Sequence, residues 1–184
     1  YPKSEPVTKI ALFNNIYQNP RNNQVIHYSP DGTPTDTVQK SWWGNEQPYE
    51  RGATFAHRQR YGQFDLVMGS YLYDKKSFRA TEFERRGRAN VNMRYRFKNV
   101  PGLSIGLNSN YQAVASGTFL IWNGIDEKAY QIWGLNDTIE NRTYLLTVDP
   151  FIEYFNAATE VKQKLVMRYY QNNNHTTQNR TTLS

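Results

Sequence analysis

The stretch that most constrains the fold is residues 88–97, Arg-Ala-Asn-Val-Asn-Met-Arg-Tyr-Arg-Phe, in which polar and apolar side chains alternate without a break. Successive side chains of a β-strand point to opposite faces, so the pattern predicts a strand with one apolar face and one basic, amide-rich face. The apolar set is Ala89, Val91, Met93, Tyr95 and Phe97, and the polar set is Arg88, Asn90, Asn92, Arg94 and Arg96. The apolar face fits either the core of a soluble sheet or the lipid around a membrane barrel.

Six further segments are also predicted to be strands, and no segment sustains the 3.6-residue apolar period of an amphipathic helix. The chain is therefore predicted to be all-β and antiparallel. The seven predicted strands are residues 9–17, 52–60, 63–73, 88–97, 103–115, 144–155 and 162–172. Several exceed the five or six residues usual in soluble proteins and match the roughly 9–11 residues that cross a bilayer at a tilt.

Short and long connections alternate between these predicted strands. The short ones are residues 61–62, 98–102 and 156–160, and the long polar ones are residues 18–51, 74–87, 116–143 and 173 onward. Outer-membrane barrels have this rhythm, because their periplasmic turns are short and their extracellular loops are long. The pattern favours an antiparallel transmembrane β-barrel segment.

Composition narrows the function classes. Hydrophobic residues make up 38% of the 184 residues, and no stretch approaches the roughly 20 apolar residues of a membrane-spanning helix. The absence of cysteine excludes disulfides and cysteine-ligated metals. His27, His57 and His175 lie far apart and have no metal-ligand spacing, so we expect no metal site and no cofactor. The formal charge of +6 does not by itself name a partner.

Asp149 and Glu153 share one face of their predicted strand and are the strongest candidates for acid–base chemistry. Four residue steps along a strand separate them by roughly 13 Å, which exceeds either glycosidase geometry. We therefore expect ion pairs with basic residues of neighbouring strands, and no enzymatic activity. The expected partners are Arg88, Arg94, Arg96 and Arg168. A nucleic-acid site at residues 84–88 is disfavoured, because the aromatic residues alternate onto the apolar face instead of the basic one.

Five segments carry a family resemblance over most of residues 53–178. They are Phe-Ala-His-Arg-Gln-Arg-Tyr-Gly-Gln-Phe-Asp-Leu-Val-Met-Gly-Ser-Tyr-Leu-Tyr at 55–73, Arg-Tyr-Arg-Phe-Lys-Asn-Val-Pro-Gly-Leu-Ser-Ile-Gly at 94–106, Thr-Phe-Leu-Ile-Trp at 118–122, Val-Asp-Pro-Phe-Ile-Glu-Tyr at 148–154 and Arg-Tyr-Tyr-Gln-Asn-Asn-Asn at 168–174. In this order and spacing they resemble the barrel region of TonB-dependent outer-membrane receptors of the Bacteroidota type.

The resemblance implies a barrel of roughly 22 strands with a plugged lumen. Residues 1–184 would then be a partial barrel domain that lacks the plug domain and the remaining strands. Seven strands cannot close a bacterial barrel, which has an even number from eight upward. The polar stretch from residue 171 onward is expected to be a loop with no closing strand, which also favours a piece of a larger barrel.

The function implied by the resemblance is energised import of a scarce nutrient, such as a siderophore, haem, cobalamin, or an oligosaccharide or peptide. The implied location is the cell outer membrane. The implied partners are outer-membrane lipid, the plug domain of the same polypeptide, the TonB complex through parts outside this chain and, in the starch-utilisation type, a surface lipoprotein.

The candidate ligand-binding residues are Arg88, Arg94 and Arg96 in the lumen and Trp42, Trp43 and Trp122 in the outer loops. The lumen arginines would line the transport path or contact the plug. The tryptophans either stack on cargo or belong to the aromatic girdle of a barrel, and the sequence leaves both readings open.

The alternative is a soluble, aromatic-rich β-sandwich that acts as a carbohydrate-binding module. The 14 tyrosines and four tryptophans fit this reading, and so do the long loops. This reading does not explain the strand lengths, the alternation of short and long connections or the expected loop with no closing strand after residue 171.

Overall fold

The computed structural model describes residues 5–41, 43, 45–119 and 138–179, and every regular element in these residues is a β-strand. The strands are β1 (Val7–Ile16), β2 (Gln24–Tyr28), β3 (Pro34–Gln39), β4 (Tyr49–Tyr61), β5 (Phe64–Lys76), β6 (Phe83–Arg96), β7 (Leu103–Phe119), β8 (Thr138–Asn156), β9 (Val161–Val166) and β10 (Tyr169–Asn179). The five strands from β4 to β8 have 13 to 19 residues each.

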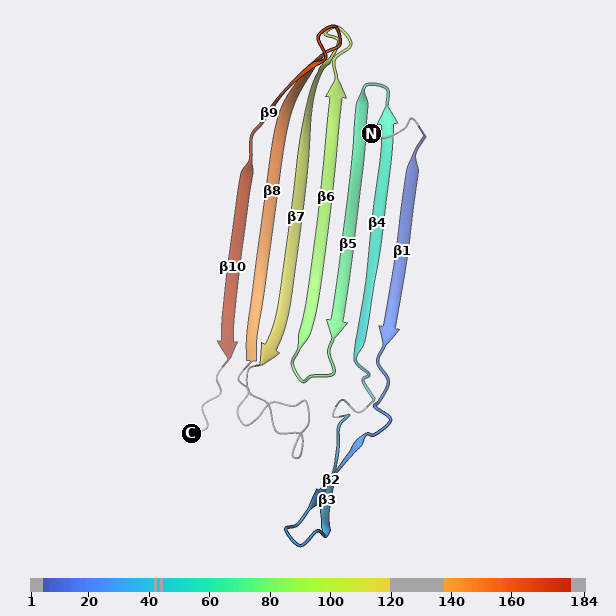
Figure 1. The fold of residues 1–184 in the computed structure, drawn as a ribbon, viewed down its shortest axis with the longest axis vertical. Coiled ribbons are helices and arrows are strands. Elements are labelled where there is room, and N and C mark those ends of the chain that lie inside the picture. Colours follow the sequence, from blue (N-terminus) through green and yellow to red (C-terminus); the bar gives the residue numbers. More distant parts are fainter. Residues whose placement is uncertain (1–4, 42, 44, 120–137, 180–184) are drawn as a thin grey trace.

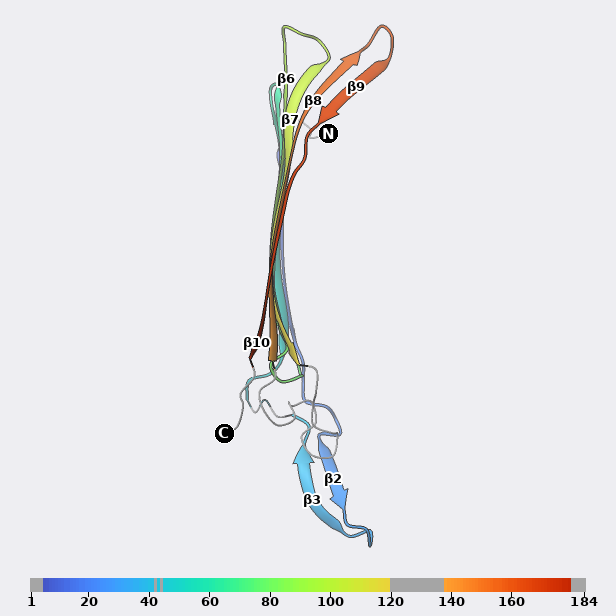
Figure 2. The same ribbon diagram turned by 90° about the vertical axis from the view of Figure 1, so that its left-hand side faces the viewer.

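One large antiparallel sheet contains all strands except the β2–β3 hairpin (Figure 1). Its order is β1-β4-β5-β6-β7-β8-β10, and β9 pairs with β8 beside β10. From β4 to β8, strands that follow one another in the chain are neighbours in the sheet, as hairpin connections require. The edge-on view in Figure 2 shows one thin layer with the β2–β3 hairpin projecting beyond one end. The predicted all-β, antiparallel fold is confirmed.

β9 and β10 form one interrupted strand along the same edge of β8. Val166 of β9 pairs with Phe151, and Tyr169 of β10 pairs with Val148, three residues further along both strands. The register therefore continues through the break. Pro150 lies opposite the break, and its missing N–H removes one hydrogen bond from the ladder. With β9 and β10 counted together, each of the seven predicted strands has its counterpart in the sheet.

The register gives the sheet two chemically different faces, because paired residues of neighbouring strands point to the same side. We call the side that carries Arg88, Asn90, Asn92, Arg94 and Arg96 of β6 the polar face. We call the side that carries Ala89, Val91, Met93 and Tyr95 the apolar face. The register extends this division to the neighbouring strands, since Met93 pairs with Leu66 and Leu107 on the apolar face. The predicted alternation is confirmed, except that Phe97 lies just beyond the end of β6.

The described residues form no second layer over either face of the sheet. Only three of their apolar side chains, Trp43, Pro48 and Phe151, are buried. The chain exposes 12992 Å², whereas a typical folded monomer of 21.6 kDa exposes roughly 9,200 Å². A β-sandwich, the rival fold, buries its core between two sheets about 10 Å apart. Beside the large sheet, the described residues contain only the two-stranded β2–β3 hairpin.

The connections differ between the two ends of the sheet. Tight connections at residues 62–63, 97–102 and 157–160 lie at what we call the short-turn end (Figure 1). Residues 17–48, which include the β2–β3 hairpin, and residues 77–82 lie at the loop end. β7 and β8 also meet at this end, on either side of residues 120–137, which lie outside the described part of the chain.

The predicted long loops are shorter than expected, because the strands continue into polar sequence. Residues 74–87 were expected to be a loop, but only residues 77–82 lie between β5 and β6. β7 and β8 likewise extend into the predicted loop 116–143. The polar stretch after residue 171 is not a loop up to residue 179, since β10 pairs there with β8. Backbone hydrogen bonds to a long partner strand hold these polar segments extended, whatever their side chains are.

The β2–β3 hairpin was not expected from the sequence. Two backbone hydrogen bonds close its turn: the N–H of Ser29 donates to the carbonyl oxygen of Thr33, and the N–H of Gly32 donates to the carbonyl oxygen of Ser29, both at 2.8 Å. The Asp31 carboxylate accepts the backbone N–H of Thr33 at 3.0 Å and its hydroxyl at 2.7 Å. Gly32 has φ of +84°, which glycine adopts without a Cβ penalty. The Asp-Gly pair at this turn is the local sequence signal for the hairpin.

Candidate functional site: the polar face

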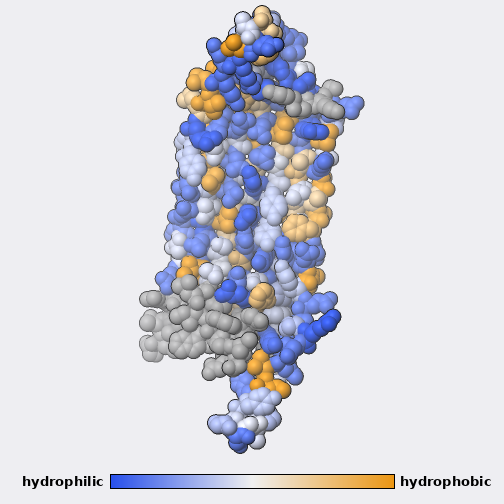
Figure 3. All heavy atoms as spheres, in the orientation of Figure 1, coloured by the Kyte–Doolittle hydropathy of each residue, from blue (hydrophilic) through white to orange (hydrophobic). Residues whose placement is uncertain are grey.

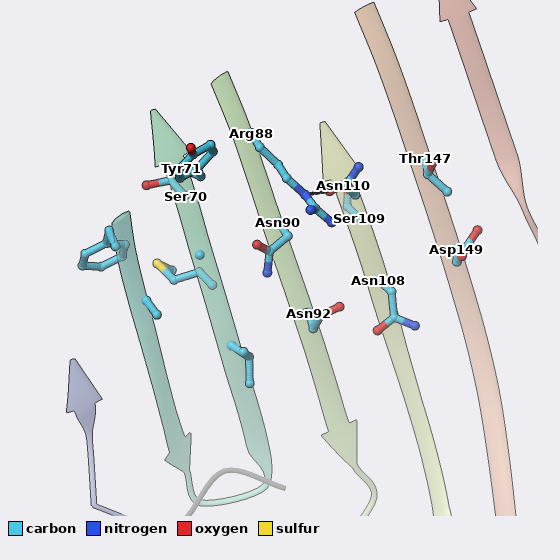
Figure 4. Close-up of a pocket in the computed structure, with 15 residues that line it drawn as sticks. Ser70, Tyr71, Arg88, Asn90, Asn92, Asn108, Ser109, Asn110, Thr147 and Asp149 are labelled. Carbon is cyan, nitrogen blue, oxygen red and sulfur yellow. Dashed lines mark hydrogen bonds between the residues drawn. The ribbon is translucent and has the colours of Figure 1, made fainter. Parts of the chain in front are cut away.

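Four asparagines from two neighbouring strands form the centre of the polar face. Asn90 pairs with Asn110, and Asn92 pairs with Asn108, so the four amides lie in two adjacent rows across β6 and β7. We call this group the asparagine patch. Arg88 donates its Nε–H to Asn110 Oδ1 at 2.9 Å. Figure 4 shows these side chains together.

A shallow depression of about 600 Å³ lies over the asparagine patch. Tyr71, Arg88, Thr147 and Asp149 also line it (Figure 4). Its floor includes Gly69 of β5, where an added Cβ would come within 2.8 Å of Asn90 Oδ1. The missing side chain at Gly69 therefore makes room for Asn90. Amide, hydroxyl and guanidinium groups around one depression can offer both donors and acceptors to a polar ligand.

Two nearly buried carboxylates on the polar face lie closer to the short-turn end, and each is held by two cations. Asp65 is 4% exposed; its Oδ1 lies 2.9 Å from Arg60 Nε, and its Oδ2 pairs with Arg96. Glu153 is 7% exposed; it lies 3.5 Å from Arg94 and 3.1 Å from Lys162. These ion pairs tie β4 to β5 and β6, and β8 to β6 and β9.

The predicted ion pairing of the arginines is right for two of the four. Arg94 pairs with Glu153, and Arg168 holds Asp149 through two contacts, Nε–Oδ1 at 2.9 Å and Nη2–Oδ2 at 2.7 Å. Arg96 pairs with Asp65 of β5 instead, a carboxylate that was not one of the expected partners. Arg88 contacts an amide oxygen and not a carboxylate.

Asp149 and Glu153 are therefore each engaged by basic side chains and do not face one another. The described residues contain no group of three or more His, Asp or Glu side chains that could hold a metal ion. His57 instead lies 2.8 Å from the hydroxyl of Thr8 across the β1–β4 pair. The chemistry of the polar face is that of hydrogen bonding and ion pairing.

Trp43 is the one predicted tryptophan that lies in the described residues; Trp42 and Trp122 lie outside them. Trp43 is 8% exposed, and its indole N–H donates to Asn19 Oδ1 at 3.0 Å and Gln47 Oε1 at 3.1 Å. The ring is thus packed inside the long loop between β1 and β4. In this arrangement it organises the loop and offers little surface for stacking.

The opposite face has a predominantly apolar band that is open to its surroundings and is interrupted by His57, Gln59, Ser70 and Ser109. Leu12 is 77% exposed, Leu72 60% and Ile152 50%. Toward the short-turn end the band finishes with aromatic rings, where Tyr95 meets Phe97 edge-to-face at a centroid distance of 5.3 Å. Toward the loop end it finishes at the row of Gly87, and charged residues follow. By contrast, the broad face shown in Figure 3 is mostly hydrophilic over β5 to β7.

None of the residues that the structure describes belongs to a helix with the length and hydropathy needed to cross a membrane. No protein-family model, curated protein or solved structure matches the chain significantly.

Proposed function

We propose that the chain is part of the β-barrel of a TonB-dependent outer-membrane receptor and takes part in the energised import of a scarce nutrient. In this proposal the apolar face contacts lipid of the cell outer membrane, and the polar face lines the lumen. The candidate cargoes are a siderophore, haem, cobalamin, or an oligosaccharide or peptide. The chain contributes binding and translocation, and no covalent chemistry.

The observation that carries the proposal is a single-layer sheet of long strands in which the apolar band of one face is left open. In water, a monomeric protein rarely leaves such a band uncovered, since its largest exposed apolar patch is typically about 300–600 Å². Lipid removes the cost of exposing it, since hydrocarbon solvates these side chains. The polar face then keeps its arginines and carboxylates in a wet lumen.

The dimensions of the apolar band also support a membrane setting. Its rows run from Gly87 to Tyr95 on β6, which corresponds to roughly 20–26 Å of height, depending on strand tilt, at about 3.3 Å per residue. The apolar band of outer-membrane barrels is about 25 Å tall and has aromatic residues at its rims. Tyr61, Phe64 and Tyr95 occupy the rim at the short-turn end.

The edges of the sheet bear on how such a barrel would be completed. In the described residues, β1 and β10 each pair on one side only. Unpaired N–H and C=O groups cost several kcal/mol each in hydrocarbon, so the proposal requires further strands beside both edges. This agrees with the expectation of a larger barrel of roughly 22 strands.

The polar face gives the proposal its candidate path for cargo. Arg88 lines the depression over the asparagine patch, whereas Arg94 and Arg96 belong to the ion-paired zone near the short-turn end. We therefore assign Arg88 to contact with cargo or plug, and Arg94 and Arg96 to holding the wall rigid. The plug domain, the TonB complex and a surface lipoprotein remain proposed partners.

The assignment of the two faces is tested with fluorophores, and the cysteine-free chain makes this straightforward. Met93→Cys and Asn92→Cys are neighbours on opposite faces, as are Leu107→Cys and Asn108→Cys. Each labelled variant is placed in lipid–detergent micelles and quenched with a nitroxide lipid or with iodide. We expect the lipid to quench positions 93 and 107, and iodide to quench positions 92 and 108. Equal quenching at neighbouring positions, or a stable monomer in plain buffer, contradicts the proposal.

The import role is tested in the bacterium that makes the protein. Disruption of the gene is expected to abolish uptake of one scarce, large nutrient only while the membrane is energised. Uptake of small, porin-permeable solutes is the matched control and is expected to be unchanged. Unchanged uptake of every candidate cargo class would argue against import.

A further inference from the structure

Two arginines share one carboxylate on the apolar face, where the apolar band meets the loop end. Asp74 Oδ2 lies 2.7 Å from Arg51 Nη2 and 3.0 Å from Arg51 Nε, and Asp74 Oδ1 lies 3.5 Å from Arg85 Nε. The Tyr49 hydroxyl also donates to Asp74 Oδ2 at 3.0 Å. The side chains of Arg51 and Arg85 are 58% and 71% exposed, so both guanidiniums remain accessible.

This cluster has an excess of positive charge and of hydrogen-bond donors. One carboxylate faces two guanidiniums, which leaves a net charge of +1 (two positive, one negative) in the cluster. Each guanidinium carries five N–H donors, so a single carboxylate cannot engage them all. Aromatic rings hold the arginines in place: Arg51 lies 4.5 Å from the Tyr49 ring centroid and Arg85 lies 5.6 Å from that of Phe83.

An apolar groove begins next to the cluster, on its side toward the short-turn end. One register row away from Arg51, Asp74 and Arg85, β4 and β6 carry Ala53 and Gly87, whose small size leaves a hollow. The groove is lined on the apolar face by Leu12, Ala53, Leu72, Gly87, Ala113 and Tyr144, and Arg51, Asp74 and Arg85 close it on the side of the loop end. The site thus combines a channel for a hydrocarbon chain with a cationic head.

We propose that Arg51 and Arg85 bind the anionic phosphate of a lipid headgroup, and that an acyl chain of that lipid lies in the groove over Ala53 and Gly87. This inference rests on the proposed membrane function. Guanidinium groups pair with phosphate through parallel, charge-assisted hydrogen bonds, and a cation at the edge of a lipid-facing band lies at headgroup depth. The occupant is a lipid of the leaflet on the loop side.

The neighbouring residue Arg86 supplies a matched control. It lies on the polar face, where it pairs with Glu84, and it differs from Arg85 by one position in the same strand. The full chain in detergent is mixed with equal amounts of phosphatidylglycerol and phosphatidylcholine, and retained lipid is counted by native mass spectrometry. We expect preferential retention of phosphatidylglycerol, lowered about fivefold by either Arg51→Gln or Arg85→Gln. Arg86→Gln is expected to leave the preference unchanged.

A second measurement leaves both arginines intact and so does not depend on the folding of their variants. Ala115→Cys, which pairs with Arg85 on the apolar face, carries a fluorophore in the otherwise native chain. A nitroxide near the headgroup of phosphatidylglycerol should quench it more strongly than the same nitroxide on phosphatidylcholine. Equal quenching by the two lipids, loss of preference in Arg86→Gln, or displacement of the lipid by millimolar inorganic phosphate overturns the inference. If position 93 is lipid-exposed in any of these cases, the membrane proposal still stands; if it is not, both proposals fail.

Discussion

Arg168 grips Asp149 with two parallel contacts, of 2.9 Å and 2.7 Å, directly beside the position where Pro150 removes a backbone hydrogen bond from the edge of the sheet. The ion pair holds the segment between β9 and β10 against β8. Asp149 is well covered, with its side chain 13% exposed, whereas the side chain of Arg168 is 68% exposed. The contact therefore compensates for a missing backbone hydrogen bond at an exposed edge of the sheet.

A double-mutant cycle measures this contact. Arg168→Met and Asp149→Asn each remove one partner and keep a side chain of similar size. We expect a coupling free energy of about 0.5–1 kcal/mol in the unfolding of the detergent-solubilised chain, because the guanidinium is largely exposed and screened by water. Hydrogen exchange should also quicken selectively in β10. Strictly additive effects of the two substitutions would show that the ion pair contributes nothing.

Asp65 is the carboxylate whose loss should cost most, because it is 4% exposed and neutralises two arginines. Asp65→Asn is expected to lower the free energy of unfolding by about 1–3 kcal/mol, since it leaves Arg60 and Arg96 facing a neutral group. Glu46→Gln is the control, as it breaks an ion pair with Lys76 whose carboxylate is 83% exposed. Its cost should stay below about 1 kcal/mol. Denaturant titrations that give equal costs would contradict the assigned difference in burial.

Gly102 and Gly62 provide a matched test of backbone strain in the connections at the short-turn end. Both have positive φ, +86° and +57°, which disfavours any residue with a Cβ. At Gly62 the added Cβ meets nothing within 4 Å, whereas at Gly102 it would lie 2.0 Å from the carbonyl oxygen of Phe155. Gly62→Ala should therefore cost about 1–2 kcal/mol of unfolding free energy, and Gly102→Ala clearly more. Thermal unfolding of the two variants checks which one loses more stability. A smaller loss in Gly102→Ala than in Gly62→Ala would contradict the prediction.

The β2–β3 hairpin should respond to acid through its turn. The hydroxyl of Thr33, and after it the backbone N–H of Thr33, holds the pKa of the Asp31 carboxyl below its usual 3.8. A lowered pKa in the folded state stabilises the turn fully above about pH 4, and this contribution disappears as the pH falls below 3.8 through the folded-state pKa. Thr33→Val should move the pKa of Asp31 back toward 3.8, as followed by the carboxyl carbon shift in NMR. An unchanged titration would mean that the hydroxyl does not bind the carboxylate.

Arginine substitutions distinguish a lipid-facing side from a lumen side by the folding free energy that each one costs. Val91→Arg should cost about 2–4 kcal/mol of folding free energy in lipid, because Val91 is the middle row of the band that runs from Gly87 to Tyr95. Asn92→Arg, one residue away on the polar face, should be tolerated because its side chain would enter a wet space. Equal tolerance of the two substitutions in vesicles would argue that neither face meets lipid.

The strands and their faces could be predicted from the sequence, because a strand with one apolar face shows a regular alternation of polar and apolar residues. Met93 and Asn92, for example, lie on the faces that their alternation predicts. Strand ends could not be predicted in the same way. At Asp74 or Asn173 both faces are polar, and the backbone ladder alone decides whether the strand continues.

The residue types of the polar face could be predicted from the sequence. The partners of its arginines could be predicted only in part. The basic face of β6 was expected, and Arg94 and Arg168 have the kind of partner that was predicted. The partner of Arg96 depends on the register between β5 and β6, which a single sequence does not specify. The cluster of Arg51, Asp74 and Arg85 was missed for the same reason, since these residues lie on three strands and meet only in the folded sheet.

The unbroken register across Pro150 also limits how this chain can change in length over evolution. One residue inserted between Met167 and Arg168 would carry Arg168 to the apolar face and separate it from Asp149, whereas two inserted residues would keep the faces of β10 unchanged. Insertions and deletions within the strands should therefore occur in steps of two. Single-residue changes should accumulate in the connections, where no face has to be preserved.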